Sequence, residues 1–597
     1  MNVLRRFVMG VVVLTLLVGA AAARAQVLKQ LPSDALVVVK LNNAEAVSQR
    51  LGALMQRLGL ANFQPDLADP LTALKKQINI KEGFDAKGDI AVGVYADPAG
   101  GPEPLGVILV AVTDYKAFLG NLPAVKDEGD GISSFAPREG AETVFVTNWG
   151  NYAAASNNKG MLAKKPDGMT IASAAAQKQF DKADLVMYAN TKHIAGKVLP
   201  MWKDGKPQWI AMLDQGLAGA PNMQPKYVPV LKALVVQLLN TAEQTLTDTN
   251  GATVAINITK DGVAATIVAD FLPDSYIGKL MATSTNTDAN LLAGLPNRKY
   301  FAVGGATMSA ATSTQLINDW LGPIVTELTK VGPEAQPIID LVDAFKKMPE
   351  AVKSTTMGYA VPTGAPGQQA LFQVAGVIQG DSAKIGELQR KAQKGAMDLM
   401  KMMPNQGGLT MESKIEDGAA EVAGVKLDKV TNKFVLDPNN PQAAQIKPMI
   451  DMMYGPNGMS GVMGAVSATT YVQAIGGDDD FNSAVVAAAK SNDAALSQLA
   501  HIKAVTAQLP PNRAAVMYIH LDNIATTVLA YAAQFGFRVP LKLQPDIAPL
   551  GVSVGTEGTA LRIDVVVPNE IIENAVSATM QVMMMRQGGG ARPGGGL

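Results

Sequence analysis

The pattern of hydrophobic and polar positions along the chain repeats a strand followed by an amphipathic helix. Residues 36–41 form a short apolar run containing β-branched side chains, which predicts a buried strand. Apolar residues then recur at helical spacing while polar residues occupy the opposite face: Val47, Leu51, Leu54, Met55 and Leu58. The same order recurs at 184–199, 299–321 and 514–529. The pattern therefore predicts one kind of strand–helix pair at four places.

Each strand–helix pair is followed by a second recurring pattern, two strands joined by a turn and ending in a short helix. Residues 254–281 alternate apolar and polar side chains on either side of an Asp-Gly turn, and 551–580 do so around a Glu-Gly turn. In 88–122 and 357–392 the turn is longer and rich in proline and glycine. The chain thus predicts four β-α-β-β-α units in which long and tight turns alternate.

The alternation of turn types indicates a tandem duplication of a half that contains two related units. A further strand, turn and helix at 146–165 corresponds to 465–490. Hairpins with helices beside them predict an α+β fold with largely antiparallel sheets covered by helices. We expect a first α+β repeat domain over 26–290 and a second over 291–585.

The spacing between matching positions indicates where the halves diverged. The offset is 264 from Leu31 to Leu295 but 319 from Tyr152 to Tyr471. The second half therefore gained residues, and we place this insertion near 390–463.

Methionines concentrate in the predicted insertion and near the end of the chain. They occur in 397–403, 449–463 and 580–585, and the first cluster is Met397, Met400, Met402 and Met403. Thioether sulfur suits Cu(I), which would make the segment a copper site. Alternatively, methionine fills irregular apolar gaps or forms an adaptable binding surface. The absence of histidine from these segments favours ordinary packing.

The two ends of the chain predict export and a flexible tail. Arg5 and Arg6 precede an apolar run over 7–23, and "ARAQ" offers small residues to a signal peptidase, so we expect a signal peptide over 1–25 cleaved after Ala25. The run is shorter than the roughly 20 residues of a spanning helix, although an uncleaved anchor is the alternative. We expect a periplasmic or secreted protein without a stable membrane span. The Gly-rich residues 586–597 predict a flexible tail.

Composition excludes several classes of function. The sequence contains no cysteine, which excludes disulfides, thiol catalysis and thiolate metal sites. Without Arg5, Arg6 and Arg24 the 51 basic residues become 48 against 52 acidic ones. This balance lacks the basic footprint of a nucleic-acid-binding protein.

The candidate chemistry is sparse. The histidines are His193, His501 and His520, and we expect them to be scattered surface or capping residues. No hydrolase, metalloprotease or nucleotide-binding motif occurs, so we predict no catalytic, cofactor-binding or metal-binding residue and no enzyme. The acidic run "GGDDDF" at 476–481 offers a calcium site or a helix cap, and the following helical pattern favours the cap.

Three segments carry a resemblance to a family. Behind the leader, "LPSDALVVVKLNNAEAVSQRL" (31–51), "VTNWGNYAAASNNKGML" (146–162) and "LPPNRAAVMYIHLDN" (509–523) resemble bacterial exported proteins known only as a domain of unknown function. The resemblance covers most of the mature chain. It implies export and repeated strand–helix units, and it implies no catalytic residue.

These observations lead to three hypotheses of function. The first is an exported, non-enzymatic envelope protein that binds or scaffolds an unknown envelope protein. The second is a carrier of a hydrophobic ligand such as lipid, held between sheet and Met-rich helices. The third is methionine-based copper binding in the periplasm.

Overall fold

The structure is a computed structural model that describes residues 27–588 apart from short gaps. These gaps are 98–100, 102, 164, 167, 172, 219–224, 365–366, 403–408, 437–442, 535 and 538–540. The predicted signal peptide over 1–25 lies outside the described residues. Residues 589–597 of the predicted tail lie outside them as well.

The chain divides into two compact units. The first comprises residues up to 203 together with 243–282 and 557–564, and the second comprises 204–242, 283–556 and the residues from 565 onward. Five elements are divided between the units: α6 (Thr191–Ala218), α7 (Val228–Asp248), α8 (Tyr276–Thr283), β19 (Leu550–Glu557) and β20 (Ala560–Pro568).

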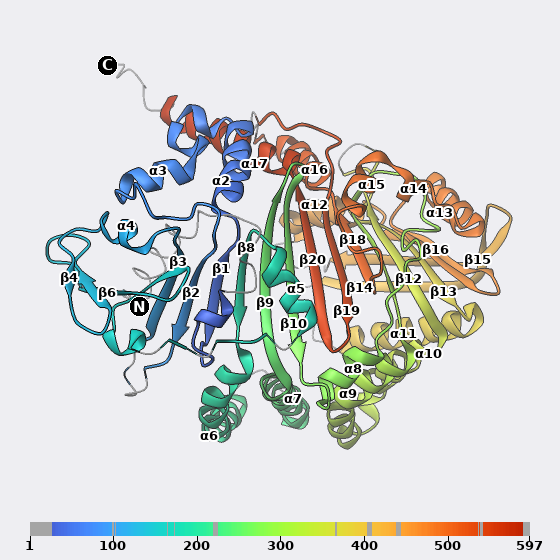
Figure 1. Ribbon diagram of the computed structural model, residues 1–597. Coiled ribbons are helices and arrows are strands. Elements are labelled where there is room, and N and C mark those ends of the chain that lie inside the picture. The colour runs from blue at the N-terminus through green and yellow to red at the C-terminus, as the bar shows by residue number, and fades with distance from the viewer. Residues whose placement is uncertain are drawn as a thin grey trace, which may run out of the picture. The chain divides into compact units, whose positions relative to one another are not determined.

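The first unit contains an antiparallel sheet (Figure 1). Its strands lie in the order β4-β5-β6-β7-β3-β2-β1-β8-β9-β10. The strands are β1 (Val37–Leu41), β2 (Ile90–Tyr95), β3 (Leu105–Ala111), β4 (Lys126–Asp127), β5 (Ile132–Phe135), β6 (Val144–Asn148), β7 (Tyr152–Ser156), β8 (Leu185–Ala189), β9 (Thr249–Thr259) and β10 (Gly262–Phe271). The helices are α2 (Ala44–Arg57), α3 (Pro70–Gln77), α4 (Tyr115–Leu119), α5 (Ala174–Lys182) and α8 (Tyr276–Thr283).

The second unit also contains an antiparallel sheet. Its order is β14-β15-β16-β17-β13-β12-β11-β18-β19. The strands are β11 (Tyr300–Thr307), β12 (Val352–Ala360), β13 (Gln373–Gly380), β14 (Leu409–Val422), β15 (Val425–Leu436), β16 (Met459–Ser467), β17 (Thr470–Ile475), β18 (Ala515–Ile519) and β19 (Leu550–Glu557). The helices are α9 (Ala310–Val331), α10 (Gln336–Ala351), α11 (Ser382–Met402), α12 (Ala443–Tyr454), α13 (Asp479–Ser491), α14 (Ala495–Gln498), α15 (Ala500–Thr506), α16 (Leu521–Gln534) and α17 (Asn569–Gly588).

The two sheets share one pairing order. Adding ten to each strand number of the first unit, from β4 at one end of the order as far as β9, gives the order of the second. Strand β8 thus lies between β1 and β9, while β18 lies between β11 and β19. Antiparallel pairing with helices packed on the sheets confirms the predicted α+β class.

Helix α5 covers one face of the first sheet. Phe180 of α5 is fully buried and belongs to a core that includes Val186 and Tyr188 of β8 and Ala255 of β9. Full burial of side chains of this size contributes about 1.5–3 kcal/mol each. This face is therefore the hydrophobic core of the first unit.

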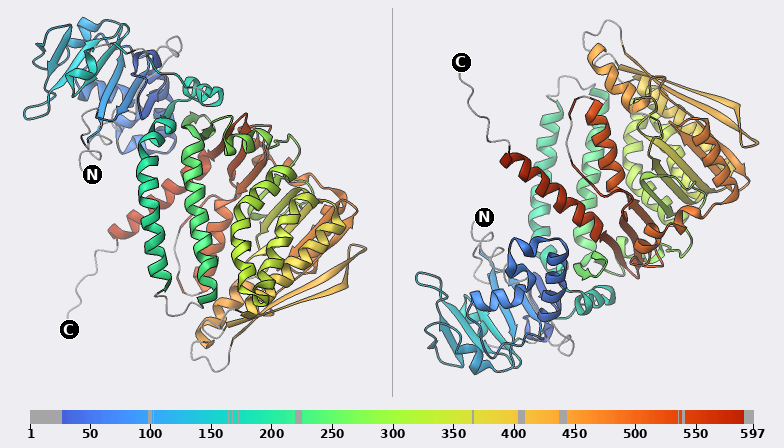
Figure 2. Two further views of the ribbon diagram at one scale, coloured as in Figure 1. Left: turned by 90° about the horizontal axis from the view of Figure 1, so that it is seen from below. Right: turned by 90° about the horizontal axis from the view of Figure 1, so that it is seen from above.

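Long helices form a second hydrophobic cluster in the other unit. Leu234 of α7 contributes to a cluster that includes Ile324 and Leu328 of α9 and Ile338 of α10. Figure 2 shows α9 and α10, in light green, running side by side. Since α9 leaves the end of β11 and α16 leaves the end of its antiparallel neighbour β18, the two helices begin at opposite ends of the sheet.

The strands of the Met-rich segment near 390–463 have counterparts in the first unit, whereas its helix α12 has none between β5 and β6. Strands β14, β15 and β16 pair as β4, β5 and β6 do, but β14 and β15 have 14 and 12 residues where β4 and β5 have two and four. The added residues thus lengthen a shared hairpin. The hairpin carries a bulge after Glu416, where the Gly418 amide donates to Asp428 Oδ1 over 2.9 Å.

The flexible tail was predicted to begin at residue 586, which the structure places inside a helix. Helix α17 continues through Gly588, so residues 586–588 are helical, whereas a flexible segment from 586 was expected. The intrinsic cost of glycine in a helix, about 1 kcal/mol, is small enough for one glycine to extend an existing helix.

Candidate functional site: the open sheet faces

The repeated phrase of the sequence places a methionine on an uncovered sheet face. In β8, Val186 and Tyr188 are buried in the core, whereas Met187 between them is 43% exposed. In β18, Val516 and Tyr518 are buried and Met517 is 41% exposed. Because side chains alternate between the faces of a strand, both methionines lie on the face opposite the core.

The open face of the second unit extends from β18 to the neighbouring strands, and the residues paired across it are uncharged. Gly304 of β11 pairs with Met517 on one side and with Met357 of β12 on the other, and Met357 is 45% exposed. The next row on this face is Leu550, Ile519, Ala302 and Tyr359. Each of these side chains is half-buried or exposed.

Gly304 leaves a gap in the row of side chains between the two methionines. A Cβ atom there would lie 2.4 Å from the Val516 carbonyl oxygen and 3.3 Å from Cβ of Met517, so no larger residue fits without moving β18. The flexible thioether side chains of Met357 and Met517 therefore flank a position that has no side chain. Methionine adapts its shape to irregular apolar partners, which suits a binding surface.

The first unit has a similar open face. Met187 pairs with Val39 of β1 and with Val254 of β9, and Val254 pairs with Ile267 of β10. Ile267 is exposed, and Val39 and Val254 are half-buried. Both units thus present a row of apolar side chains, centred on the methionine of the repeated phrase, to the outside of the sheet.

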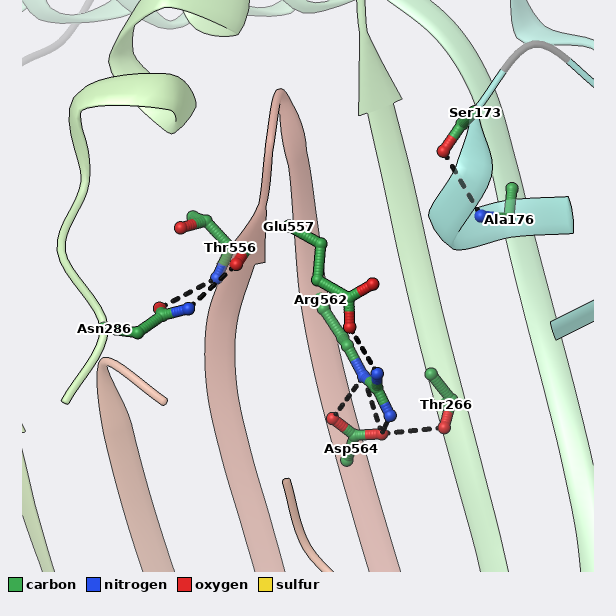
Figure 3. Close-up of polar contacts among 8 residues, drawn as sticks. All are labelled: Ser173, Ala176, Thr266, Asn286, Thr556, Glu557, Arg562 and Asp564. Carbon is green, nitrogen blue, oxygen red and sulfur yellow. Dashed lines mark hydrogen bonds and ion pairs between the residues drawn. The ribbon is translucent and has the colours of Figure 1, made fainter. Parts of the chain in front are cut away.

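A polar cluster stabilises the first part of β20. Figure 3 shows Arg562 between two acids: its Nη2 donates to Asp564 Oδ1 over 2.8 Å, and its Nη1 contacts Glu557. Thr266 donates to the same Asp564 oxygen over 2.7 Å. Burial alone would lower the pKa of Arg562, but the hydrogen bonds with Asp564 and Glu557 outweigh it and raise the pKa. Since Arg562 engages both carboxylates, the cluster holds the strand in place and does not supply a general acid–base pair.

A second buried acid, Asp270, belongs to the same unit. Burial raises the pKa of Asp270, Ser173 lowers it through a hydrogen bond, and the negative charge of Glu557 raises it further. Asp270 lies on β10, and none of the described cavities includes it.

The histidines are less scattered than the sequence suggests. His193 is exposed in the first turn of α6, and its backbone N–H donates to the Asn190 side chain. His501 of α15 and His520 at the end of β18 lie edge to face with ring centroids 5.6 Å apart. The expectation of isolated histidines is wrong for this pair, because the fold joins positions that no local spacing connects.

The acidic run caps a helix. Asp478 Oδ1 accepts a hydrogen bond of 2.8 Å from the Phe481 backbone N–H at the start of α13. This contact confirms the predicted cap. Among the described residues no three His, Asp or Glu side chains are grouped as metal ligands.

The predicted methionine clusters lie in several elements. Met397 is half-buried in α11, Met449 is 51% exposed on α12, and Met463 is buried in β16. Met403 lies outside the described residues, as do the side chains of Met400 and Met402. A cavity of about 460 Å³ between β15 and α12 is lined by Phe434 and Tyr454 and by no methionine of the described chain. The exposed methionines of the open faces lie outside the methionine clusters predicted from the sequence, because they are isolated along the chain.

Comparisons with known proteins leave the resemblance noted above as an expectation. No family model matches the chain, and no curated protein matches it. A solved structure, crystal form I of TP0453, matches 41% of this chain and 78% of that chain with 10% sequence identity and a TM-score of 0.21. Similarity this low supports no inference about this chain. Across the described residues, no helix has the length and apolarity required to cross a membrane.

Proposed function

We propose that this protein is a non-enzymatic binding protein of the cell envelope and that its ligand is hydrophobic. The observation that carries the proposal is the uncovered apolar face of the second sheet, with Met357 and Met517 on either side of Gly304. The envelope location rests on the predicted signal peptide. A scaffolding role toward an envelope protein is the related alternative.

The physical argument concerns the cost of exposed apolar surface. A row of half-exposed aliphatic side chains is unfavourable in water by about 25 cal/mol per Å² of apolar surface. A lipid acyl chain laid along the row would remove that surface from water and gain about 0.8 kcal/mol for each buried CH₂. The row contains no charged side chain that an acyl chain would have to desolvate.

We also propose that the chain arose by tandem duplication, as its alternating turns indicate. The shared pairing order of the two sheets supports this origin. So does the matching position of Met187 and Met517, each between a buried valine and a buried tyrosine. Under duplication the open methionine face is an inherited feature, and each unit offers one binding face.

The test is a titration of the mature chain with a fluorescent fatty acid. We expect saturable binding in the micromolar range and a loss of at least tenfold in affinity for the double variant Met357→Gln/Met517→Gln. The matched control is Met449→Gln, which changes another exposed methionine outside the open face. Binding that is absent, or equal in the double variant and the control, would overturn the proposal.

Native mass spectrometry of protein purified from its own envelope fraction separates the alternatives. A co-purifying lipid mass supports a hydrophobic ligand, and a co-purifying protein supports a scaffold. Copper binding stays a prediction. It is tested by replacing Met397, Met400, Met402 and Met403 with leucine, because unchanged Cu(I) affinity would exclude that cluster.

A further inference from the structure

A small cavity with both ionisable and apolar side chains in its lining lies in the second unit. Its volume is about 320 Å³, and it is bounded by the residues before β11, the end of β18, the first turn of α16 and the helices α14 and α15. This volume is at the lower end of the range for ligand pockets, about 300–1,000 Å³, and suits a small molecule.

One acid in the cavity has an unmet hydrogen-bonding requirement. Asp522 in the first turn of α16 is 4% exposed, and its Oδ1 accepts no hydrogen bond from any residue that the structure describes. Leaving a buried polar atom without a partner costs about 1–3 kcal/mol, and more when the group is charged. A hydrogen-bond donor that enters the cavity would remove this cost.

Of the two basic residues in the lining, one has an ion-pair partner and the other has a nitrogen atom without a hydrogen-bond partner. Lys299 pairs with Asp546 over 2.6 Å, and both side chains are mostly exposed. Arg298 lies over the ring of Phe481 at 5.3 Å, and its buried Nη1 has no hydrogen-bond partner within the described part of the chain. One cationic group and one anionic group of the lining, Arg298 and Asp522, therefore remain open to a ligand.

The remaining lining is neutral. Burial and the neighbouring His501 together lower the pKa of His520 to about 4, although the charge of Asp522 opposes the shift. Burial also lowers the pKa of His501. Both imidazoles are therefore uncharged at pH 7, and the apolar side chains of Leu496 and Leu499 complete the wall.

We propose that this cavity binds a small zwitterion of the α-amino-acid class with an apolar side chain. Its ammonium group would donate to Asp522, its carboxylate would accept from Arg298, and its side chain would lie against Leu496 and Leu499. This site is independent of the hydrophobic ligand proposed for the open face, since the two share no residue.

Isothermal titration of the mature full-length chain tests the proposal with three matched probes. L-Leucine carries both charges, L-leucinamide lacks the carboxylate, and 4-methylpentanoate lacks the ammonium. We expect leucine to bind and each analogue to bind at least tenfold more weakly. Failure of leucine to bind at millimolar concentration, or equal binding of all three, would overturn the assignment.

Two variants separate ligand binding from folding. Asp522→Asn removes the buried charge at constant size, so we expect it to abolish leucine binding while the melting temperature stays equal or rises. Asp480→Asn, an exposed acid of the same unit, should leave both unchanged. Zn²⁺ binding that depends on His501 and His520, without leucine binding, would replace this proposal with a metal site that forms on rearrangement.

Discussion

The Nζ of Lys40 lies 3.2 Å from Oδ2 of Asp89, and neither side chain has any exposed surface. Lys40 also donates to the Phe180 carbonyl oxygen over 3.3 Å and lies 4.9 Å from the centroid of the Phe180 ring. In the second unit the matching position is Gly305, because Lys40 pairs with Val186 as Gly305 pairs with Val516. The ion pair therefore belongs to the core of one unit alone.

This pair predicts an asymmetric response to mutation. Lys40→Met leaves Asp89 as a buried charge without its cation, and we expect a loss of about 3–5 kcal/mol in the free energy of unfolding. Lys40→Met/Asp89→Leu removes both charges and should recover most of that loss. Urea unfolding followed by circular dichroism measures both. A double variant as unstable as the single one would contradict this account.

His520 predicts a loss of stability in acid. Its pKa is about 4 in the folded protein and near 6.5 when unfolded, so the unfolded chain binds the extra proton. The contribution is fully present above pH 6.5 and is lost as the pH falls toward 4, by roughly 2–3 kcal/mol at pH 4.5.

The matched variant for this acid effect is His520→Gln, which cannot take up a proton in this range. We expect its unfolding free energy to fall less than that of the parent protein between pH 7.5 and pH 4.5. His193→Gln, at an exposed position, is the control and should follow the parent. If the unfolding free energy of His520→Gln fell by as much as that of the parent protein between these pH values, groups other than His520 would cause the loss of stability in acid.

The cap of α13 predicts a modest and local effect. Asp478→Ala removes the acceptor for the Phe481 N–H and should cost about 1 kcal/mol. Asp478→Ser keeps an acceptor and should restore most of this. Thermal unfolding of the three proteins tests the order, and equal stability of the serine and alanine variants would exclude a capping role.

Substitutions on the two faces of β18 should change the free energy of unfolding by very different amounts. Met517→Thr changes an exposed side chain on the open face, and we expect a change within about 0.5 kcal/mol. Tyr518→Ala, one residue further, removes a core side chain and should cost about 3–5 kcal/mol. Chemical unfolding of both variants decides, and a large cost for Met517→Thr would mean that the face is covered in the folded protein.

The strands and helices were accessible from sequence because their periodicity is local. Alternation around the Asp-Gly turn predicted β9 and β10, and "GGDDDF" predicted the cap of α13. The open face was not predicted, because Val516, Met517 and Tyr518 are all apolar and the pattern cannot separate a covered from an uncovered side. The contact of His501 with His520 was missed for another reason, since it depends on how α15 packs beside β18.

The long hairpin of the Met-rich segment places an edge strand of the sheet where another copy of the chain could pair with it. Strand β14 pairs with β15 and with no other described strand, so one of its edges offers free backbone groups to a foreign strand. Glu412, Lys414 and Glu416 place charges along this margin, and the bulge after Glu416 bends it. A second molecule adding to the sheet would have to desolvate those charges and match that bend. The charges and the bend thereby protect this outermost strand against edge-to-edge growth of the sheet into fibres.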